Sequence, residues 1–340
     1  MADKVNIGLI GAGRIGRVHA ETLTRLVPGA RLLAVTDVRL DAARELAAQF
    51  GIARVADEPA ALLADPDIQA VAICSSTDTH ARFIQEAARS GKHIFCEKPI
   101  DLDLARIDAT LAEVDRAGVK LQVGFNRRFD PNFSRIHDLV ASGKLGRPEV
   151  VRITSRDPAP PPIEYIKVSG GIFLDMTIHD FDMARYLMGD EVEEVYASGS
   201  VLVDPAIGAA GDLDTALVSL RFRSGAIGVI DNSRRAVYGY DQRVEVFGSL
   251  GSAQANNNTP TNTVVSDASG VHADKPLYFF LERYQAAYVA EMRAFVDCIL
   301  NDTTPPVTGR DARAPVVMGL AAWRSCREHR PVSLKEVEPG

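Results

Sequence analysis

Apolar and polar positions follow two different patterns along the chain, and the change falls near residue 125. Before that point, short apolar runs alternate with amphipathic stretches that have helical spacing. Such an alternation of buried strands and helices predicts a parallel sheet covered on both faces. We therefore expect an α/β domain with a doubly wound parallel sheet over residues 1–124. Its predicted strands are residues 5–10, 32–36, 70–74, 93–96 and 120–123.

The second pattern contains more consecutive strands and fewer helices. A Pro-rich stretch at residues 158–162 indicates a surface loop, and two helices close the chain. This order predicts an α+β domain with a mostly antiparallel sheet over residues 125–340. We expect the first closing helix to be able to pack back on the first domain. The predicted strands are residues 150–154, 192–203, 214–222, 226–233 and 242–247, and the predicted helices are residues 133–140, 173–187, 284–300 and 312–327.

Composition and charge restrict the class of protein. The 340 residues suit two domains, and 46% hydrophobic residues are enough for a sizeable core. Lys and Arg total 38 against 45 Asp and Glu, a net charge of -7, which argues against nucleic acid or an anionic membrane as a partner. No apolar stretch is long enough to cross a bilayer. The start, Met1 to Lys4, leads directly into an apolar strand, so we expect no signal peptide.

The cysteines give no sign of a metal or disulfide framework. They stand at positions 74, 96, 298 and 326, and none forms a CxxC pair. We therefore expect neither a zinc ribbon nor disulfide bonds. The reducing cytoplasm is the natural compartment for such a chain.

A glycine-rich turn follows the first predicted strand and opens a helix. Its sequence is Gly11-Ala12-Gly13-Arg14-Ile15-Gly16. The first glycine allows a tight turn, the second lets the backbone approach a pyrophosphate, and the third lets the helix pack close to the strand. The helix N-terminus presents free N–H groups to the phosphates. The motif predicts a dinucleotide site.

Two further segments lie where this cofactor would bind. Asp37 ends the second strand at the spacing of a carboxylate that binds the adenosine ribose, which favours NAD over NADP. The alternative for Asp37 is a cap for the following helix. Residues 75–80 follow the third strand, and Thr77 or Thr79 could be an ordinary N-cap. We expect cofactor contacts from Ser75, Thr77 and His80.

Two short segments carry candidate chemistry. Glu97-Lys98-Pro99 follows a core strand, at the end of the sheet where ligands bind. In the second domain, Asp175, His179 and Asp182 have the spacing of residues that share one face of a helix. An exposed face, a metal site and an acid–base dyad are alternatives for these three residues. No cysteine or second histidine nearby suggests a zinc site, and we place catalysis first.

The order of these motifs resembles a known family. The glycine loop, Glu97-Lys98-Pro99 and the pair Asp175 and His179 are similar to those of the Gfo/Idh/MocA oxidoreductases, and the similarity covers essentially the whole chain. Residues 124–130, 170–186 and 233–241 are similar to the members that act on inositol.

The resemblance implies an NAD-binding Rossmann domain over residues 1–124, followed by a substrate-binding and oligomerisation domain over residues 125–340 with an open, mostly antiparallel sheet. It also implies a homotetramer in which such sheets pack together. It implies that Lys98, Asp175 and His179 form the catalytic group, with Glu97 and Lys98 beside NAD. Arg127 and Arg128 have an alternative role as structural ion-pair partners. The remaining candidate substrate contacts are Asn126, Arg127, Asp157, Asp182, Tyr238 and Tyr284.

The reaction that the resemblance implies is NAD-dependent oxidation of a ring hydroxyl of a cyclic polyol to a ketone. myo-Inositol is the first expected substrate, and scyllo-inositol or a pyranose such as glucose are alternatives. As a hypothesis, His179 takes the hydroxyl proton, and Asp175 fixes the tautomer and orientation of the His179 imidazole. Lys98 stabilises the reacting oxygen. A non-catalytic NAD sensor is the alternative of a different class, and a sensor has no need for all three residues. We expect no metal.

Overall fold

The computed structural model describes residues 4–338, so the expected absence of a signal peptide, which rests on Met1 to Asp3, lies outside the described residues. Within that range the chain divides into two compact units. Unit 1 contains residues 4–129 and Ala286–Ala314, and unit 2 contains Asp130–Gln285 and Pro315–Glu338. The boundary at Phe129 is a few residues beyond the predicted one.

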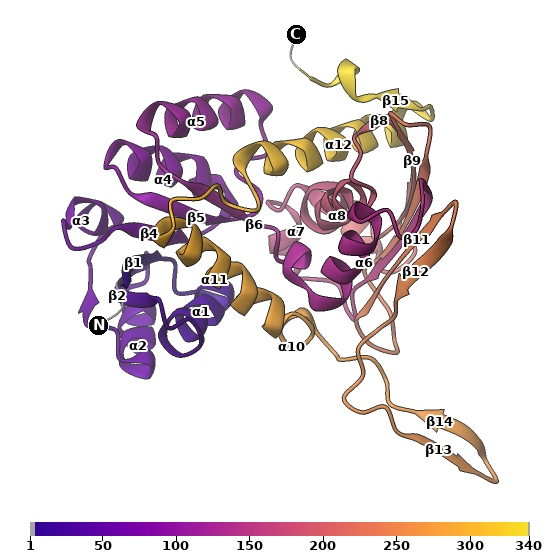
Figure 1. Ribbon diagram of the computed structural model, residues 1–340, viewed down its shortest axis with the longest axis horizontal. Helices are drawn as coiled ribbons and strands as arrows, with labels where there is room; N and C mark the ends of the chain where they lie inside the picture. Colours follow the sequence, from indigo (N-terminus) through magenta and orange to yellow (C-terminus); the bar gives the residue numbers. More distant parts are fainter. Residues whose placement is uncertain (1–3, 339–340) are drawn as a thin grey trace. The chain divides into compact units, whose positions relative to one another are not determined.

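Unit 1 is built on a six-stranded sheet in which every neighbouring pair is parallel. The order β3-β2-β1-β4-β5-β6 reverses its direction of growth at β1, so the sheet is doubly wound as expected (Figure 1). Because the strands are parallel, their carboxyl ends lie at one edge of the sheet. The strands are β1 (Val5–Ile10), β2 (Ala30–Thr36), β3 (Arg54–Val55), β4 (Ala70–Ile73), β5 (His93–Glu97) and β6 (Leu121–Gly124).

A late segment of the chain completes the core of unit 1. Met292, Phe295 and Val296 of α11 (Gln285–Leu300) are fully buried in the same cluster as Ile7 and Leu9 of β1. The closing helix therefore packs back on the nucleotide-binding sheet. The other helical segments of unit 1 are α1 (Arg14–Glu21), the π-helical turn η1 (Thr22–Leu26), α2 (Leu40–Phe50), α3 (Pro59–Ala64), α4 (Thr77–Arg89), α5 (Leu104–Ala117) and the 3-10 turn η2 (Asn126–Phe129).

Unit 2 contains a seven-stranded sheet of order β12-β11-β7-β10-β9-β8-β15. Its pairs are antiparallel except β7 with β10, which are parallel in register from Ile227 opposite Val150. The expectation of a mostly antiparallel sheet is confirmed. The strands are β7 (Pro148–Arg156), β8 (Val192–Ser200), β9 (Thr215–Phe222), β10 (Ile227–Ser233), β11 (Asp241–Gly248), β12 (Gly251–Ala255) and β15 (Val332–Ser333).

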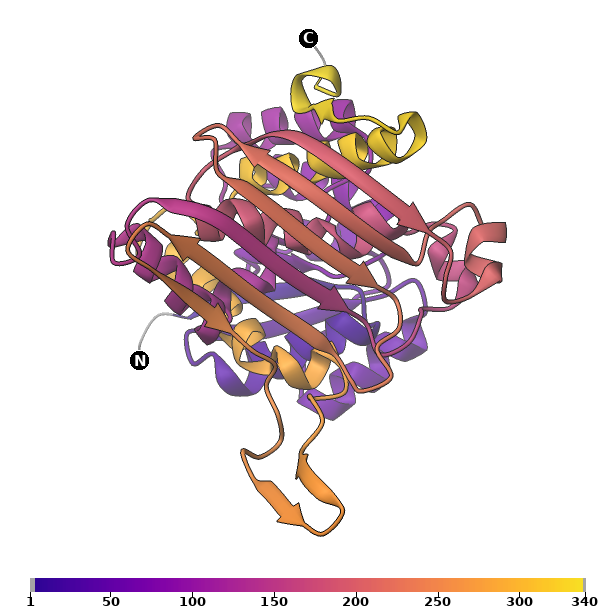
Figure 2. The same cartoon turned by 90° about the vertical axis from the view of Figure 1, so that its right-hand side faces the viewer.

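The two faces of this sheet differ because side chains alternate along each strand. In β9 every second residue, from Ala216 to Phe222, is buried, whereas Leu217 is 55% exposed. Figure 2 shows the other face uncovered by helices of the same unit. The helical segments of unit 2 are α6 (Pro131–Ala141), α7 (Ile163–Ile166), the π-helical turn η3 (Ile172–Met176), α8 (Ile178–Met188), α9 (Pro205–Ala209) and α10 (Phe280–Arg283); α12 (Gly309–Glu328) and the 3-10 turn η4 (Leu334–Glu336) follow.

One hairpin was not expected from the sequence. Strands β13 (Val264–Asp267) and β14 (Gly270–Ala273) pair only with each other and extend from unit 2 (Figures 1 and 2). Val264, Val265 and Val271 are more than half exposed, so neither face shows the alternation that marks a half-buried strand. Among the described residues, no helix is both long and apolar enough to span a membrane.

Candidate active site

The glycine loop has the geometry that its sequence predicts. Gly11 has a positive φ of 106°, and a Cβ there would lie 2.5 Å from the Cys74 backbone oxygen. A Cβ on Gly16 would lie 2.0 Å from the Gly11 oxygen, so helix α1 needs this glycine to approach the turn. A Cβ on Gly13 would meet nothing within 4 Å. Gly13 therefore leaves the open approach that a pyrophosphate requires, and the loop fits a dinucleotide.

Asp37 is tied to the same loop. One carboxylate oxygen accepts a hydrogen bond from the Ala12 backbone N–H at 2.7 Å, and the other accepts from the Arg39 N–H at 2.8 Å. The second contact forms a turn just before α2, whose N-cap residue is Arg39. A carboxylate has about four acceptor sites, so these two bonds are compatible with ribose recognition by Asp37.

The segment after β4 is anchored by His80. His80 is 1% exposed, and its Nδ1 and Nε2 lie 2.7 Å and 3.1 Å from the backbone oxygens of Pro99 and Ser75. Its ring joins two loops at the carboxyl edge of the sheet, and its contact with the cofactor stays a prediction. The helix starts at Thr77, while Ser75 and Thr79 share a hydrogen bond of 2.7 Å between their hydroxyls.

A buried acidic group lies beneath the end of β5, and we call His19, Glu97 and Glu291 the Glu97 cluster. Glu97 Oε1 lies 2.6 Å from His19 Nε2 in α1. Glu291 of α11 is fully buried, and neither carboxyl oxygen has a hydrogen-bond partner among the described residues. Burial, and then the negative charge of Glu97, raise the pKa of Glu291 well above its ordinary value. The protonated form of Glu291 is thus favoured.

The remaining predicted residues of unit 1 follow neighbouring strands. Lys98 comes after Glu97 at the carboxyl end of β5 and is half-buried. Asn126 and Arg127 lie in η2, directly after β6, and are 4% and 5% exposed. Arg128 pairs with Asp311 at 3.3 Å, which confirms an ion-pair role for one of the two arginines.

The predicted polar helix face needs a correction. Asp175 lies in the π-helical turn η3, whereas His179 and Asp182 lie in α8, which starts at Ile178. The three residues therefore do not share a regular α-helix, and the four-residue spacing does not by itself place Asp175 above His179. Asp182 is fully buried, and His179 is partly buried.

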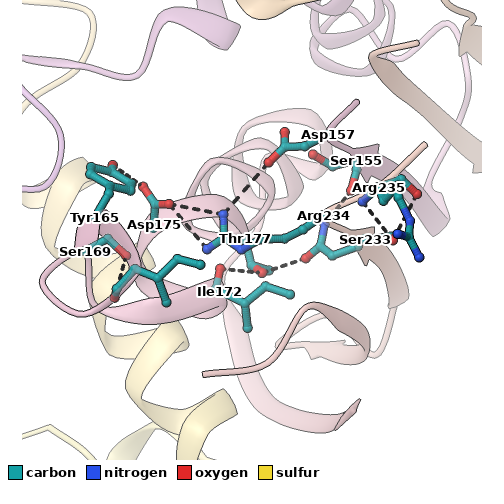
Figure 3. Close-up of polar contacts among 12 residues, drawn as sticks. Ser155, Asp157, Tyr165, Ser169, Ile172, Asp175, Thr177, Ser233, Arg234 and Arg235 are labelled. Carbon is teal, nitrogen blue, oxygen red and sulfur yellow. Dashed lines mark hydrogen bonds and ion pairs between the residues drawn. The ribbon is translucent and has the colours of Figure 1, made fainter. Parts of the chain in front are cut away.

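Asp175 is held by two residues of unit 2 that the sequence did not single out (Figure 3). The Tyr165 hydroxyl donates a hydrogen bond of 2.8 Å to Asp175 Oδ1. Both terminal nitrogens of Arg234 lie 3.4 Å from Asp175 Oδ2. The sequence offered a weak signal for Arg234, which falls inside the segment 233–241 that resembles the family. Nothing in the sequence shows that its side chain is buried.

The other candidate substrate contacts in unit 2 lie in different settings. Asp157 follows β7, and its Oδ2 is 3.9 Å from Arg234 Nη1. Tyr238 is 38% exposed, and its hydroxyl donates to Asp241 at 2.6 Å. Tyr284 is 2% exposed, and its hydroxyl donates to Gln242 at 3.3 Å.

No group of three or more His, Cys, Asp or Glu side chains within residues 4–338 has an arrangement that could hold a metal ion. All four cysteines are free thiols. Burial, and then the charge of Glu97, raise the pKa values of Cys74 and Cys96 well above the ordinary range.

Comparison with protein families identifies the chain. Residues 5–125 match the oxidoreductase family with an NAD-binding Rossmann fold, and residues 133–254 match the GFO/IDH/MocA C-terminal domain. The chain belongs to the Gfo/Idh/MocA oxidoreductase family. The resemblance noted in the sequence is confirmed, and the cofactor of this family member is NAD.

Members of this family with high similarity carry informative names. The chain is 54% identical to a myo-inositol 2-dehydrogenase from Thermotoga maritima, over 98% of this chain and 99% of that protein. A crystal structure of a probable dehydrogenase from Thermotoga maritima has 53% identity and a TM-score of 0.97, over 98% of this chain and 100% of that one. A scyllo-inositol dehydrogenase from Lactobacillus casei with bound NAD(H) and scyllo-inositol has 30% identity and a TM-score of 0.92, over 98% and 100%.

Proposed function

We propose that this family member oxidises a ring hydroxyl of a cyclic polyol to a ketone, with myo-inositol converted to 2-keto-myo-inositol. The supporting observation is the Asp175 carboxylate, fixed by Tyr165 and Arg234 four residues before His179, in a chain that also has the NAD loop and Lys98. The 54% identity to a myo-inositol 2-dehydrogenase supports the substrate.

His179 is the proposed base that takes the proton from the substrate hydroxyl. Asp175 supports the imidazole, and the Lys98 ammonium stabilises the negative charge that develops on the reacting oxygen. Bound NAD supplies the nicotinamide that accepts the hydride. The loop from Gly11 to Gly16 would hold its pyrophosphate and Asp37 its ribose, with nearby contacts from residues 75–77 and Glu97.

The proposed substrate contacts are hydrogen-bonding side chains, since a polyol presents only hydroxyl groups to its site. Tyr284 needs a rearrangement of its bond to Gln242 to serve this role, so it is the contact with the least support. The others are Asn126, Arg127, Asp157, Asp182 and Tyr238.

The first experiment mixes the purified protein with NAD and a panel of myo-inositol, scyllo-inositol, D-chiro-inositol, D-glucose and L-glucose, and records NADH formation. We expect the highest kcat/KM with myo-inositol. His179→Ala should lower kcat by about 100- to 10,000-fold, the usual contribution of a general base, and leave the Kd for NAD unchanged. Near-normal turnover of that variant would rule out His179 as the base.

A second candidate substrate is scyllo-inositol, because the Lactobacillus casei relative is a scyllo-inositol dehydrogenase. Hydroxyl stereochemistry is read by a few side chains, so small differences can exchange the two isomers. The highest kcat/KM with scyllo-inositol would keep the mechanism and change the substrate. A protein that binds NAD and reduces none of it with any polyol would instead be a sensor.

The quaternary state that we propose is a homotetramer in the cytoplasm. The uncovered face of the seven-stranded sheet exposes large apolar side chains, which monomeric proteins rarely gather on one surface. These residues include Tyr196, Leu217, Ile227, Val229 and Phe247. Light scattering of the purified protein measures the state directly.

A further inference from the structure

Arg234 has an environment that the proposed reaction does not by itself explain. It follows β10, and its backbone N–H donates to the Asp214 oxygen at 2.8 Å. Its side chain is 2% exposed, and its Nε has no hydrogen-bond partner among the described residues. A buried guanidinium is unfavourable unless nearby negative charges compensate for its lost hydration. The negatively charged side chains around Arg234 therefore indicate its role.

Three carboxylates lie near the guanidinium, and we call Arg234, Asp157, Asp175 and Asp212 the Arg234 cluster; Figure 3 shows Arg234 with Asp157 and Asp175. The Arg234 nitrogens lie 3.4 Å from Asp175, 3.7 Å from Asp212 and 3.9 Å from Asp157. These distances exceed the 2.7–2.9 Å of a close charge-assisted hydrogen bond. Arg234 therefore acts as a shared positive charge among three acids rather than as a clamp on one.

The three acids come from different parts of unit 2. Asp157 follows β7, and Asp212 precedes β9. The Asp212 carboxylate also accepts the Ile172 N–H at 2.9 Å, which fixes the start of the turn that contains Asp175. Burial raises the pKa of Asp212, while the Ile172 and Leu213 N–H groups and the Arg234 charge oppose that rise. The guanidinium thus joins a strand end, a loop and the turn η3.

Tyr165 completes the environment of Asp175. Its ring is 48% exposed, but its hydroxyl reaches Asp175 Oδ1. Burial of that end, together with the Asp175 charge, raises the pKa of Tyr165, so the hydroxyl remains a donor. One side chain therefore sets the direction of Asp175, and another supplies its counter-charge.

We propose that Arg234 and Tyr165 are positioning residues for the dehydrogenase reaction: Arg234 supplies the positive charge beside the Asp175 carboxylate, and Tyr165 directs that carboxylate for its support of His179. This inference rests on the proposed function and assigns a part in the reaction to side chains that the proposed function mentions only as contacts of Asp175. Without the guanidinium, the Asp157, Asp175 and Asp212 carboxylates would lose their shared counter-charge and repel one another. The Asp175 carboxylate would then leave the position from which it supports His179.

The experiment compares Arg234→Lys and Arg234→Met with the wild-type protein, using the polyol that gives the highest turnover. For Arg234→Met we expect a loss in kcat of about 100-fold, within the range that a general base contributes. The acid limb of its kcat–pH profile should move to higher pH. Arg234→Lys keeps a positive charge and should restore part of kcat and most of the profile. The Kd for NAD should stay unchanged.

Arg235→Met is the matched control, because Arg235 is the exposed neighbour in the chain. It should keep the wild-type kcat and profile. A folded Arg234→Met variant with the wild-type pH profile would overturn the inference, even if kcat fell. Equal loss in the Met and Lys variants would overturn it too, because charge would then be irrelevant.

Tyr165→Phe keeps the test decisive if both Arg234 variants fail to fold. It removes one hydroxyl from a half-exposed ring, so folding should persist. We expect kcat to fall about 10-fold, with the KM for the polyol changed less, since a lost orienting group lowers catalysis more than binding. An unchanged kcat would overturn the inference. Absence of wild-type turnover with any polyol is a separate outcome and refutes the proposed function instead.

Discussion

The Glu97 cluster and the Arg234 cluster both bury carboxyl groups, but they do so with different counter-charges. In the Glu97 cluster, neither carboxyl oxygen of Glu291 has a hydrogen-bond partner within residues 4–338, and the raised pKa of Glu291 favours the neutral acid. In the Arg234 cluster, one guanidinium lies within 3.9 Å of three carboxylates. In the first arrangement burial favours the protonated acid, and in the second a cation lies beside the carboxylates.

This difference in counter-charge matches the role that we propose for each cluster. A neutral acid packed behind β5 has no charge with which to assist proton transfer, so Glu291 belongs to the framework of unit 1. An ionised Asp175, four residues before the proposed base, keeps the charge that such assistance requires. The comparison therefore predicts that replacing the Asp175 carboxyl group by an amide lowers activity, whereas the same replacement at Glu291 leaves activity unchanged.

Asp175→Asn and Glu291→Gln test this difference most strongly, because each replaces a carboxyl by an amide of the same shape. We expect Asp175→Asn to lower kcat by about 100-fold or more, since the imidazole loses its supporting charge. Glu291→Gln should keep kcat within about threefold, since the acid it replaces is neutral. Initial rates at saturating NAD and polyol measure both. Equal losses in kcat would show that the two clusters do not differ in this way.

The sequence predicted unit 1 more completely than either cluster. The first strand matches its predicted bounds, residues 5–10, because a continuous apolar run is a local signal. His19 and Glu97 stand 78 positions apart, and Arg234 and Asp175 stand 59 apart. The periodicity of hydrophobic residues cannot predict contacts between such distant positions. These contacts form only when the folded sheets bring the segments together.

Unit 2 shows a second reason why sequence patterns fail. The spacing of Asp175 and His179 suits an α-helix, but the π-helical turn at Ile172–Met176 changes which residues are stacked. The buried Thr177 hydroxyl donates to Asn232 at 2.6 Å, and Asn232 donates to Asp180 at 2.8 Å, so contacts with β10 fix the junction with α8. These are tertiary contacts, and helical spacing alone could not reveal them.

Each cluster also has a glycine against its carboxylate, which allows a comparison of rigidity. A Cβ on Gly171 would lie 2.5 Å from Asp212 and 2.7 Å from Trp323, where φ is also positive at 74°. A Cβ on Gly124 would lie 3.0 Å from Glu97 and 3.2 Å from Phe95. We expect Gly171→Ala to cost about 2–4 kcal/mol of unfolding free energy and Gly124→Ala about 1 kcal/mol.

Urea unfolding of the two glycine variants measures these costs. Gly13→Ala is the control, since its Cβ would meet nothing within 4 Å. It should unfold like the wild type while binding NAD more weakly, because the added methyl group occupies the approach of the pyrophosphate. A Gly124→Ala variant less stable than Gly171→Ala would mean that the Glu97 cluster is the more rigid of the two.

The smallest predicted effect concerns the proton on Glu291. Because folding raises the pKa of this group, the folded state binds a proton that the unfolded state has released above the ordinary glutamate value of about 4.3. Its contribution to stability is therefore complete below that value and is lost as pH rises through the folded pKa. This loss requires the side chain to release a proton.

Glutamine cannot release a proton, so Glu291→Gln should avoid this loss of stability at high pH. We expect the unfolding free energy of Glu291→Gln, relative to the wild type, to be higher at pH 8 than at pH 5, because only the wild type loses this contribution as pH rises. Urea unfolding at the two pH values decides the matter, because other titrating groups contribute equally to both proteins and cancel in the difference. A difference that is the same at both pH values would contradict the protonated Glu291, and with it the contrast between a neutral cluster behind β5 and an ionised one around Arg234.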